Sequence, residues 1–143
     1  YWDERARGLG PTLDAPVTSG AEENLLCYGE GRDRYLGENI FLHEFAHAVY
    51  FALQLMDSPF VDQINNAYAF GQQAWANTYA ATNVDEYFAE ATQSWFDTNI
   101  EGPAGGDGVH NATDTRNELM TFDTQISAVL SQLYGSATFN DCH

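Results

Sequence analysis

The longest regular pattern of apolar positions lies between Glu38 and Met56, a stretch that contains neither Gly nor Pro. Its apolar residues recur mostly at steps of three and four, at Phe41, Phe45, Ala48, Phe51, Ala52 and Leu55. This spacing gives a helix one broad face that can be buried. Gly37 precedes the stretch, Glu38 suits the first turn, and a turn-forming sequence at 57–59 follows it. The pattern therefore predicts one long helix.

Two further helices are predicted after this turn. One begins at Ser58-Pro59, because Pro is favoured at the first helical position, and weakens near Gly71. The next begins at Thr82, whose hydroxyl can cap the helix while Asp85, three residues later, completes a capping box.

The two ends of the chain are less regular. Residues 1–36 are rich in turn signals and contain one candidate strand, at Asn24–Tyr28. A Gly-rich loop at 101–115 is followed by 116–122 and 125–134, which predict one broken helix or two short ones. The expected fold class is mainly α (α+β), with at most a small β-sheet.

Candidate chemistry lies inside the long predicted helix, at His43-Glu44-Phe45-Ala46-His47. Two histidines four residues apart project from one helix face, so both imidazoles can bind one metal ion. The glutamate between them can then take a proton from an attacking water. This is the zincin arrangement, and it indicates hydrolysis of a peptide bond. The alternative is that His43 and His47 are ordinary core or surface histidines.

A metal site of this kind needs a third protein ligand. The metzincin pattern places a histidine six residues after the second one, but position 53 is Leu, which excludes that class. The remaining pattern uses a glutamate on a later helix, and Glu86 lies in the first turn of the third predicted helix. Its carboxylate is free if Thr82 and Asp85 form the cap. Glu86 also fits a capping box with Asn83, which is the competing interpretation.

Residues 43–47 and 79–91 together resemble a known family. His-Glu-x-x-His followed by Tyr-x-x-Thr-Asn-x-x-Glu-x-Phe-Ala-Glu-Ala is similar to the catalytic domain of anthrax lethal factor and to the related secreted Pro-Pro endopeptidases of clostridia. Both are gluzincins, zinc peptidases whose third ligand is a glutamate. The resemblance is dense over residues 38–56 and 79–91, and little correspondence is found elsewhere.

The resemblance implies a zincin-like fold and a role for each matching residue. His43, His47 and Glu86 would bind one Zn²⁺ ion, and Glu44 would be the general base of a zinc endopeptidase. Tyr79 would lie beside the metal and assist the oxyanion. Considered alone, Tyr79 is one of eight tyrosines and is equally compatible with a packing role.

Two other residues are weaker candidates. Glu90 lies four residues after Glu86 on the same helix face, where it could accept the spare N–H of a ligating imidazole. It could equally be a solvated carboxylate. His110, next to the Gly-rich segment, could bring a proton donor to the substrate, or it could be an exposed loop histidine.

Composition limits the partners. The 143 residues suit one domain, 1–143, and carry a net charge of −16. Nucleic acids and anionic membrane surfaces both require a basic face, so neither is expected as a partner. No apolar run is long enough to cross a bilayer. We expect a monomer that acts on a peptide or protein substrate.

Secretion is expected from several weak signals. The chain opens at Tyr1 without Met, which suggests a processed protein. Cys27 and Cys142 are the only cysteines and predict one disulfide, although two unrelated buried thiols are the alternative. Asn111-Ala112-Thr113 is a glycosylation sequon in a predicted loop.

Two other functions compete with an active endopeptidase. One is a catalytically silent binding domain that retains zinc, and the other is a zinc amidase that acts on a non-protein amide. Structural zinc sites are usually closed by four protein ligands, whereas this chain offers three and a glutamate placed as a base. That difference favours catalysis, but the spacing of motifs does not reveal the substrate.

Overall fold

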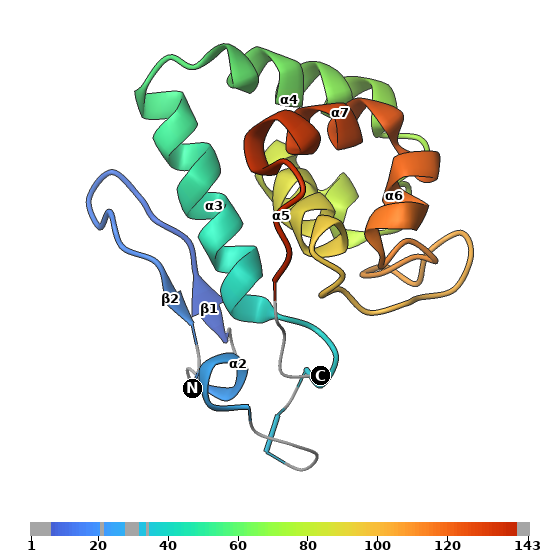
Figure 1. Ribbon diagram of the computed structural model, residues 1–143, viewed down its shortest axis with the longest axis horizontal. Coiled ribbons are helices and arrows are strands. Elements are labelled where there is room, and N and C mark those ends of the chain that lie inside the picture. Colours follow the sequence, from blue (N-terminus) through green and yellow to red (C-terminus); the bar gives the residue numbers. More distant parts are fainter. Residues whose placement is uncertain (1–6, 21, 28–31, 34, 140–143) are drawn as a thin grey trace.

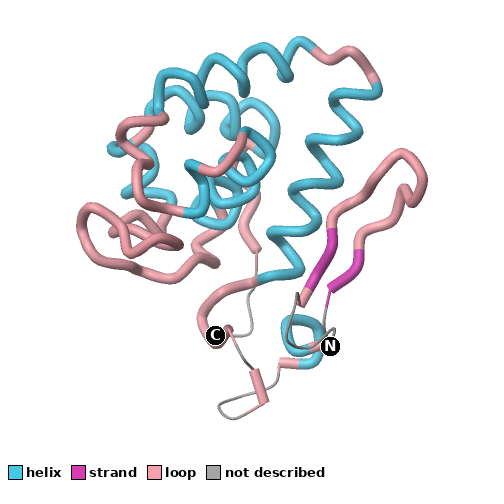
Figure 2. The backbone as a smooth tube through the Cα atoms, turned by 180° about the vertical axis from the view of Figure 1, so that it is seen from behind, coloured by secondary structure: helices cyan, strands magenta, loops and turns pink. Residues whose placement is uncertain are grey.

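The computed structural model describes residues 7–20, 22–27, 32–33 and 35–139. In this part of the chain it contains helices and one antiparallel two-stranded sheet: β1 (Gly8–Leu9), β2 (Ser19–Gly20), α2 (Glu23–Leu26), α3 (Ile40–Leu55), α4 (Pro59–Gly71), the 3-10 turn η1 (Tyr79–Ala81), α5 (Val84–Trp95), α6 (Arg116–Phe122) and α7 (Thr124–Tyr134). The expected mainly helical class is confirmed (Figure 2). None of the helices in these residues is long and apolar enough to span a membrane.

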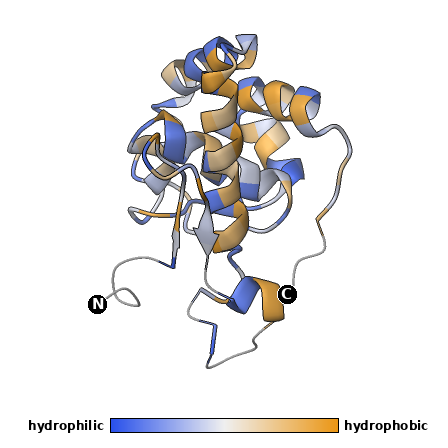
Figure 3. Cartoon of the chain, turned by 90° about the vertical axis from the view of Figure 1, so that its left-hand side faces the viewer, coloured by the Kyte–Doolittle hydropathy of each residue, from blue (hydrophilic) through white to orange (hydrophobic). Residues whose placement is uncertain are grey.

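Helix α5 lies at the centre of the helical part, between α3 on one side and α6 and α7 on the other (Figure 1). All of its residues from 87 to 95 are buried. The core around it is formed by fully buried side chains of α3 to α7: Ala46, Tyr50, Ile64, Ala67, Tyr87, Phe88, Ala91, Leu119, Ile126 and Leu130. Figure 3 shows that apolar residues are concentrated in these helices and that the connecting loops are mostly polar. Burial of apolar surface thus fixes α5 against α3.

The long predicted helix is present as α3, but it begins at Ile40 and not at Glu38. Asn39 caps it, because its side-chain oxygen accepts a hydrogen bond from the Leu42 amide. Glu38 therefore precedes the helix, and its side chain is buried. Helix α4 begins at Pro59 with Ser58 as its cap, as predicted.

The predicted cap of α5 is wrong. Asn83 and not Thr82 occupies the cap position, and its Oδ1 accepts a hydrogen bond of 2.9 Å from the Glu86 amide. Thr82 directly follows the η1 turn with a helical backbone conformation (φ −64°, ψ −48°), and so it does not act as the cap. The Glu86 side chain does not return to Asn83 but hydrogen-bonds His43. The Glu86 carboxylate is therefore directed away from the helix terminus, as expected. The capping box of Thr82 and Asp85, which was the predicted reason, is not formed.

The strand predicted at Asn24–Tyr28 is also wrong. The segment forms α2 up to Leu26, and Tyr28 lies outside the described residues. Two buried polar side chains explain the helix: Glu23 pairs with Arg7, and Asn24 binds the backbone of the segment before α3. The sheet forms instead from β1 and β2, within a stretch whose glycines and prolines indicated only turns.

The C-terminal helical region is two short helices, one of the two arrangements expected. Asp123 separates them with an extended backbone, and its Oδ1 caps α7 by accepting hydrogen bonds from the Gln125 and Ile126 amides. Cys27, which follows α2, is disulfide-bonded. Its expected partner Cys142 lies outside the described residues, so the Cys27–Cys142 pairing stays a prediction.

Candidate metal centre

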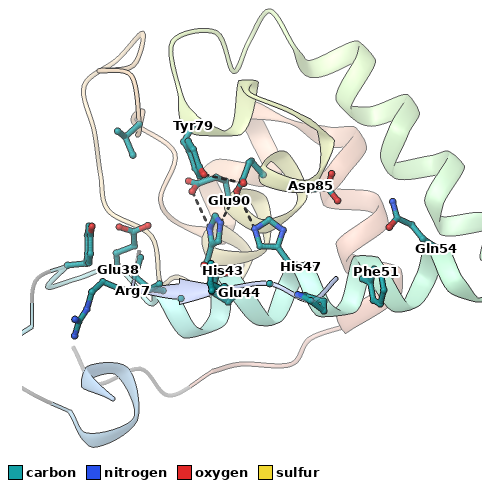
Figure 4. A pocket seen from close by; sticks show the side chains of 18 residues that line it. Arg7, Glu38, His43, Glu44, His47, Phe51, Gln54, Tyr79, Asp85 and Glu90 are labelled. Atoms are coloured by element: carbon teal, nitrogen blue, oxygen red, sulfur yellow. Dashed lines mark hydrogen bonds and ion pairs between the residues drawn. The ribbon is translucent and has the colours of Figure 1, made fainter. Parts of the chain in front are cut away.

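Three candidate ligands converge between α3 and α5. His43 and His47 lie on successive turns of α3, and both rings project toward α5 and Tyr79 (Figure 4). Glu86, in the first turn of α5, places Oε2 3.0 Å from His43 Nε2 and 3.2 Å from His47 Nε2. One donor atom from each residue lies within 4.8 Å of the others. These three side chains could hold a metal ion.

The geometry and the donor chemistry fit a divalent ion. A tetrahedral zinc ion with bonds of about 2.0–2.1 Å separates its ligand atoms by about 3.3 Å. The observed separations of 3.0 and 3.2 Å between the histidine nitrogens and Glu86 Oε2 require only a small expansion. Two imidazoles and one carboxylate are also a donor set that zinc accepts.

Helix α5 also determines which nitrogen of His43 faces the site. Gln93 Oε1 lies 2.8 Å from His43 Nδ1. The amide nitrogen of Gln93 donates to Asn39 O and to Glu38 Oε1, so its oxygen must face the histidine. Nδ1 therefore carries a proton. Without a metal ion Nε2 donates to Glu86 Oε2, and loss of the Nε2 proton would direct its lone pair at the metal position.

The charges of the site are strongly coupled. Burial disfavours the charged form of the His43 imidazole, but hydrogen bonds to Glu86, Glu90 and Gln93 outweigh it, and the pKa of His43 is raised well above its usual value. Burial opposes ionisation of Glu86, yet hydrogen bonds from His43 and His47 hold the pKa of this carboxyl far below its usual value. Glu86 is thus an anionic ligand at any ordinary pH.

Glu44 lies beside the ligands, where strand β1 crosses α3. The strand is so close that a Cβ atom at Gly8 would overlap the Glu44 side chain, and one at Gly10 would lie 2.8 Å from His47 Cβ. Burial raises the pKa of Glu44, against the opposing effect of the two histidines. Glycine is therefore required in β1 for the strand to lie against the catalytic motif predicted from the sequence.

Tyr79 is directed at the same site from the η1 turn. Its hydroxyl donates a hydrogen bond of 3.1 Å to Glu86 Oε1, and its ring stacks at 6.2 Å from that of His43. Burial and then the Glu86 charge raise the pKa of Tyr79 to about 12. The phenol therefore stays protonated and available as a donor. This position, with the hydroxyl in the site, argues against a role in packing alone.

Glu90 is buried and the His110 side chain is only 15% exposed, so neither the solvated carboxylate nor the exposed loop histidine is found. Glu90 is 3% exposed, and its Oε1 lies 3.3 Å from His43 Nδ1. The ring nitrogen Nε2 of His110 is buried 3.6 Å from Glu38 Oε2. His110 does not line the cavity beside the metal position, where it would have to lie to protonate a substrate.

A cavity of about 650 Å³ opens over the ligands. Arg7 and Glu38 lie toward one end of it and Phe51 and Gln54 toward the other (Figure 4). Its wall also contains backbone and side chains of β1 and the residues around it, namely Gly8, Leu9, Gly10 and Pro11. The metal position therefore lies in an elongated, open depression and not in a closed interior.

Sequence reasoning missed two residues behind the ligands, Gln93 and Glu38. Gln93 follows Glu86 by seven residues and Glu90 by three, so all three share one helix face. This spacing was the one feature of the sequence that could have indicated Gln93 as part of the site. Asn111 is only 7% exposed, and its carbonyl accepts the Gly102 amide. Asn111 lies in a loop, as expected, and secretion stays a prediction.

Comparison with known proteins adds no relative. The chain matches no protein-family model, and no curated protein and no solved structure is significantly similar to it. The resemblance to gluzincins therefore rests on the two sequence motifs alone.

Proposed function

We propose that this protein is a zinc-dependent endopeptidase of the gluzincin type with a zincin-like fold. The observation that carries the proposal is the convergence of His43, His47 and Glu86 beside Glu44 at the floor of an open cavity. Three protein ligands leave one position of a tetrahedral ion free, which is typical of catalytic and not of structural zinc.

Each residue has a defined part in peptide hydrolysis. Zinc held by the three ligands supplies Lewis acidity, which acidifies a water molecule near neutral pH and polarises the scissile carbonyl. Glu44 takes the proton of the attacking water and passes it to the leaving amine, and its raised pKa suits both transfers. Tyr79 stays protonated and donates a hydrogen bond to the oxyanion of the tetrahedral intermediate.

The cavity supports a peptide as the substrate. It is elongated, open along its length, and bordered by backbone of β1, so an extended chain can lie across the ligands. Substrate that lies there meets Glu44 on the side of β1 and Tyr79 on the opposite side (Figure 4). This arrangement places a proton acceptor and a hydrogen-bond donor on opposite faces of a bound amide.

Metal analysis followed by incubation with a peptide library, with and without a chelator, tests the proposal. We expect one zinc ion per chain and cleavage that stops when the chelator is present and returns when zinc is added. Zinc bound at one equivalent without cleavage of any peptide would contradict it in favour of a silent domain or an amidase.

Replacement of His47 by Ala is expected to remove zinc. The loss of a direct ligand should lower zinc affinity by more than the roughly 10–100-fold typical of changes behind the ligands. Competition with a chromophoric chelator measures this affinity. Phe45→Ala is the matched control, because Phe45 lies on the same helix with its side chain half exposed. Equal zinc affinity in the two variants would contradict the ligand assignment.

Replacement of Tyr79 by Phe is expected to lower kcat without loss of metal. Removal of one oxyanion donor typically lowers kcat by about 10²-fold or more. The hydroxyl bonds only the second oxygen of Glu86, so zinc content should stay at one per chain. Steady-state kinetics and metal analysis of the same sample check both results. A variant with unchanged kcat would leave Tyr79 as a packing residue.

A further inference from the structure

A chain of buried polar side chains leads from the Gly-rich loop to the metal ligand His43. His110 Nε2 lies 3.6 Å from Glu38 Oε2, Glu38 Oε1 accepts a hydrogen bond of 3.4 Å from Gln93 Nε2, and Gln93 Oε1 lies 2.8 Å from His43 Nδ1. Gln93 is fully buried, and the side chain of Glu38 is 7% exposed. The mechanism above uses none of His110, Glu38 and Gln93.

The loop that carries His110 is held in a fixed conformation. Asp107 Oδ1 accepts hydrogen bonds from the amides of Val109 and His110, and Gly102 packs directly against the His110 backbone. The Val109 carbonyl accepts the amide of Tyr79. The loop thus presents the His110 imidazole inward, toward Glu38, and is tied to the η1 turn at the adjacent residue.

His110 and Glu38 form an ion pair that burial makes significant. The interaction with the Glu38 carboxylate raises the pKa of His110, and burial opposes this effect. The charges of Glu90 and Asp107 raise the pKa further. A buried carboxylate is costly unless a cation or hydrogen-bond donors compensate it. The imidazolium of His110 and the amide of Gln93 supply both, and they hold the Glu38 side chain in position.

Glu38 in turn decides which acceptor His43 uses. The His43 Nδ1–H has two candidates, Gln93 Oε1 at 2.8 Å and Glu90 Oε1 at 3.3 Å. Glu90 is also held by a hydrogen bond from Asn99 to its other oxygen. Because Gln93 is anchored by Glu38 and the Asn39 carbonyl, its neutral oxygen takes the closer position.

We propose that His110 is a positioning residue that acts through Glu38 and Gln93 to hold the His43 imidazole in the orientation that the metal site requires. The inference rests on the metal site proposed above and deepens it. It assigns to the Gly-rich loop a function in zinc binding, although His110 itself touches neither the ligands nor the cavity.

A double-mutant cycle on zinc affinity tests this role. We expect about tenfold weaker zinc binding for His110→Gln and a loss within the 10–100-fold range for Gln93→Met, whose side chain keeps the volume without the amide. The double variant should bind zinc as Gln93→Met does, because His110 acts only through Gln93. Losses that multiply, or unchanged affinity in His110→Gln, would overturn the proposal.

A matched variant tests whether a loss of zinc affinity comes from the polar contacts of His110 or from a less rigid loop. Asn77 holds the other side of the loop by donating to the Gly105 and Gly106 carbonyls, and its φ of 61° is readily adopted by glycine. Asn77→Gly should leave zinc affinity little changed. A loss as large as that of His110→Gln would assign the effect to the loop as a whole and overturn the specific role of His110.

A measurement on metal-free protein keeps the inference separate from peptidase activity. The side-chain amide protons of Gln93 should exchange slowly in the parent protein and lose this protection in His110→Gln, at unchanged thermal stability. Retained protection would overturn the proposal. If the variants change zinc affinity as expected but the parent protein cleaves no peptide, the role of His110 stands. That result would contradict only the proposed endopeptidase function.

Discussion

Replacement of Glu44 by Gln is expected to abolish turnover while zinc stays bound. The amide has nearly the shape of the carboxylate but cannot take a proton, and general-base catalysis typically contributes about 10²–10⁴-fold. Glu44 bonds none of the three ligands, so the metal site should survive the change. Rates on the best peptide of the library, together with zinc content of the same preparation, measure the two effects.

The control for this experiment is a glutamate outside the cavity. Glu101 is exposed and does not line the site, so Glu101→Gln should cleave as the parent does. A Glu44→Gln protein that cleaves as fast as Glu101→Gln would remove Glu44 from the mechanism. Loss of zinc from Glu44→Gln would indicate that the residue is structural and would make the rate uninformative about proton transfer.

Replacement of Asp123 by Ala is expected to be the most destabilising change far from the cavity. Asp123 Oδ2 accepts hydrogen bonds from Trp75 Nε1 at 2.9 Å and Tyr87 Oη at 2.7 Å, and all three groups are buried. Its Oδ1 also caps α7. Loss of the cap and of two charge-assisted bonds, with two donors left unpaired, should lower the free energy of unfolding by about 3–5 kcal/mol.

Urea denaturation measures this effect, with Asp62→Ala as the control. Asp62 lies exposed in the first turn of α4, so its removal should cost less than about 1 kcal/mol. Asp123→Asn should fall between the two, since it keeps the shape and one acceptor. Equal midpoints for Asp123→Ala and Asp62→Ala would show that Trp75 and Tyr87 find other partners and that the buried carboxylate is dispensable.

The parts of the site that the sequence predicted are those fixed by helix geometry. The spacing of His43 and His47 determines that both rings leave one face of α3. The apolar stripe predicted to be buried on this helix is wrong, because Phe45, Ala52 and Leu55 are exposed and Ala46 and Tyr50 are buried instead. The meeting of the two histidines with Glu86 was expected from the resemblance, and the structure places the three together because the apolar faces of α3 and α5 pack against each other. Helix geometry and the resemblance to a known family were therefore sufficient to predict the three candidate ligands.

The rest depends on contacts between segments distant in sequence, which periodicity does not encode. Helix α2 is stabilised by the Arg7–Glu23 ion pair. The β1–β2 pair depends on the close approach of Gly8 to Glu44. Nothing in a Gly-Leu-Gly-Pro sequence distinguishes such a strand from a turn. Gln93 was missed because a buried glutamine is recognised as functional only when its partners, Glu38 and His43, are known.

The packing of α5 has a consequence for how the site can be used. Apolar side chains of α3 and α5 beside the ligands, among them Ala46, Tyr50, Phe88 and Ala91, are buried in one core, so the fold does not depend on an ion, in contrast to small domains that fold only around their metal. The chain can therefore fold first and acquire zinc afterwards, and zinc can leave and return without unfolding. The occupancy of the site, and with it any activity, would then follow the zinc concentration of the surroundings as a reversible control.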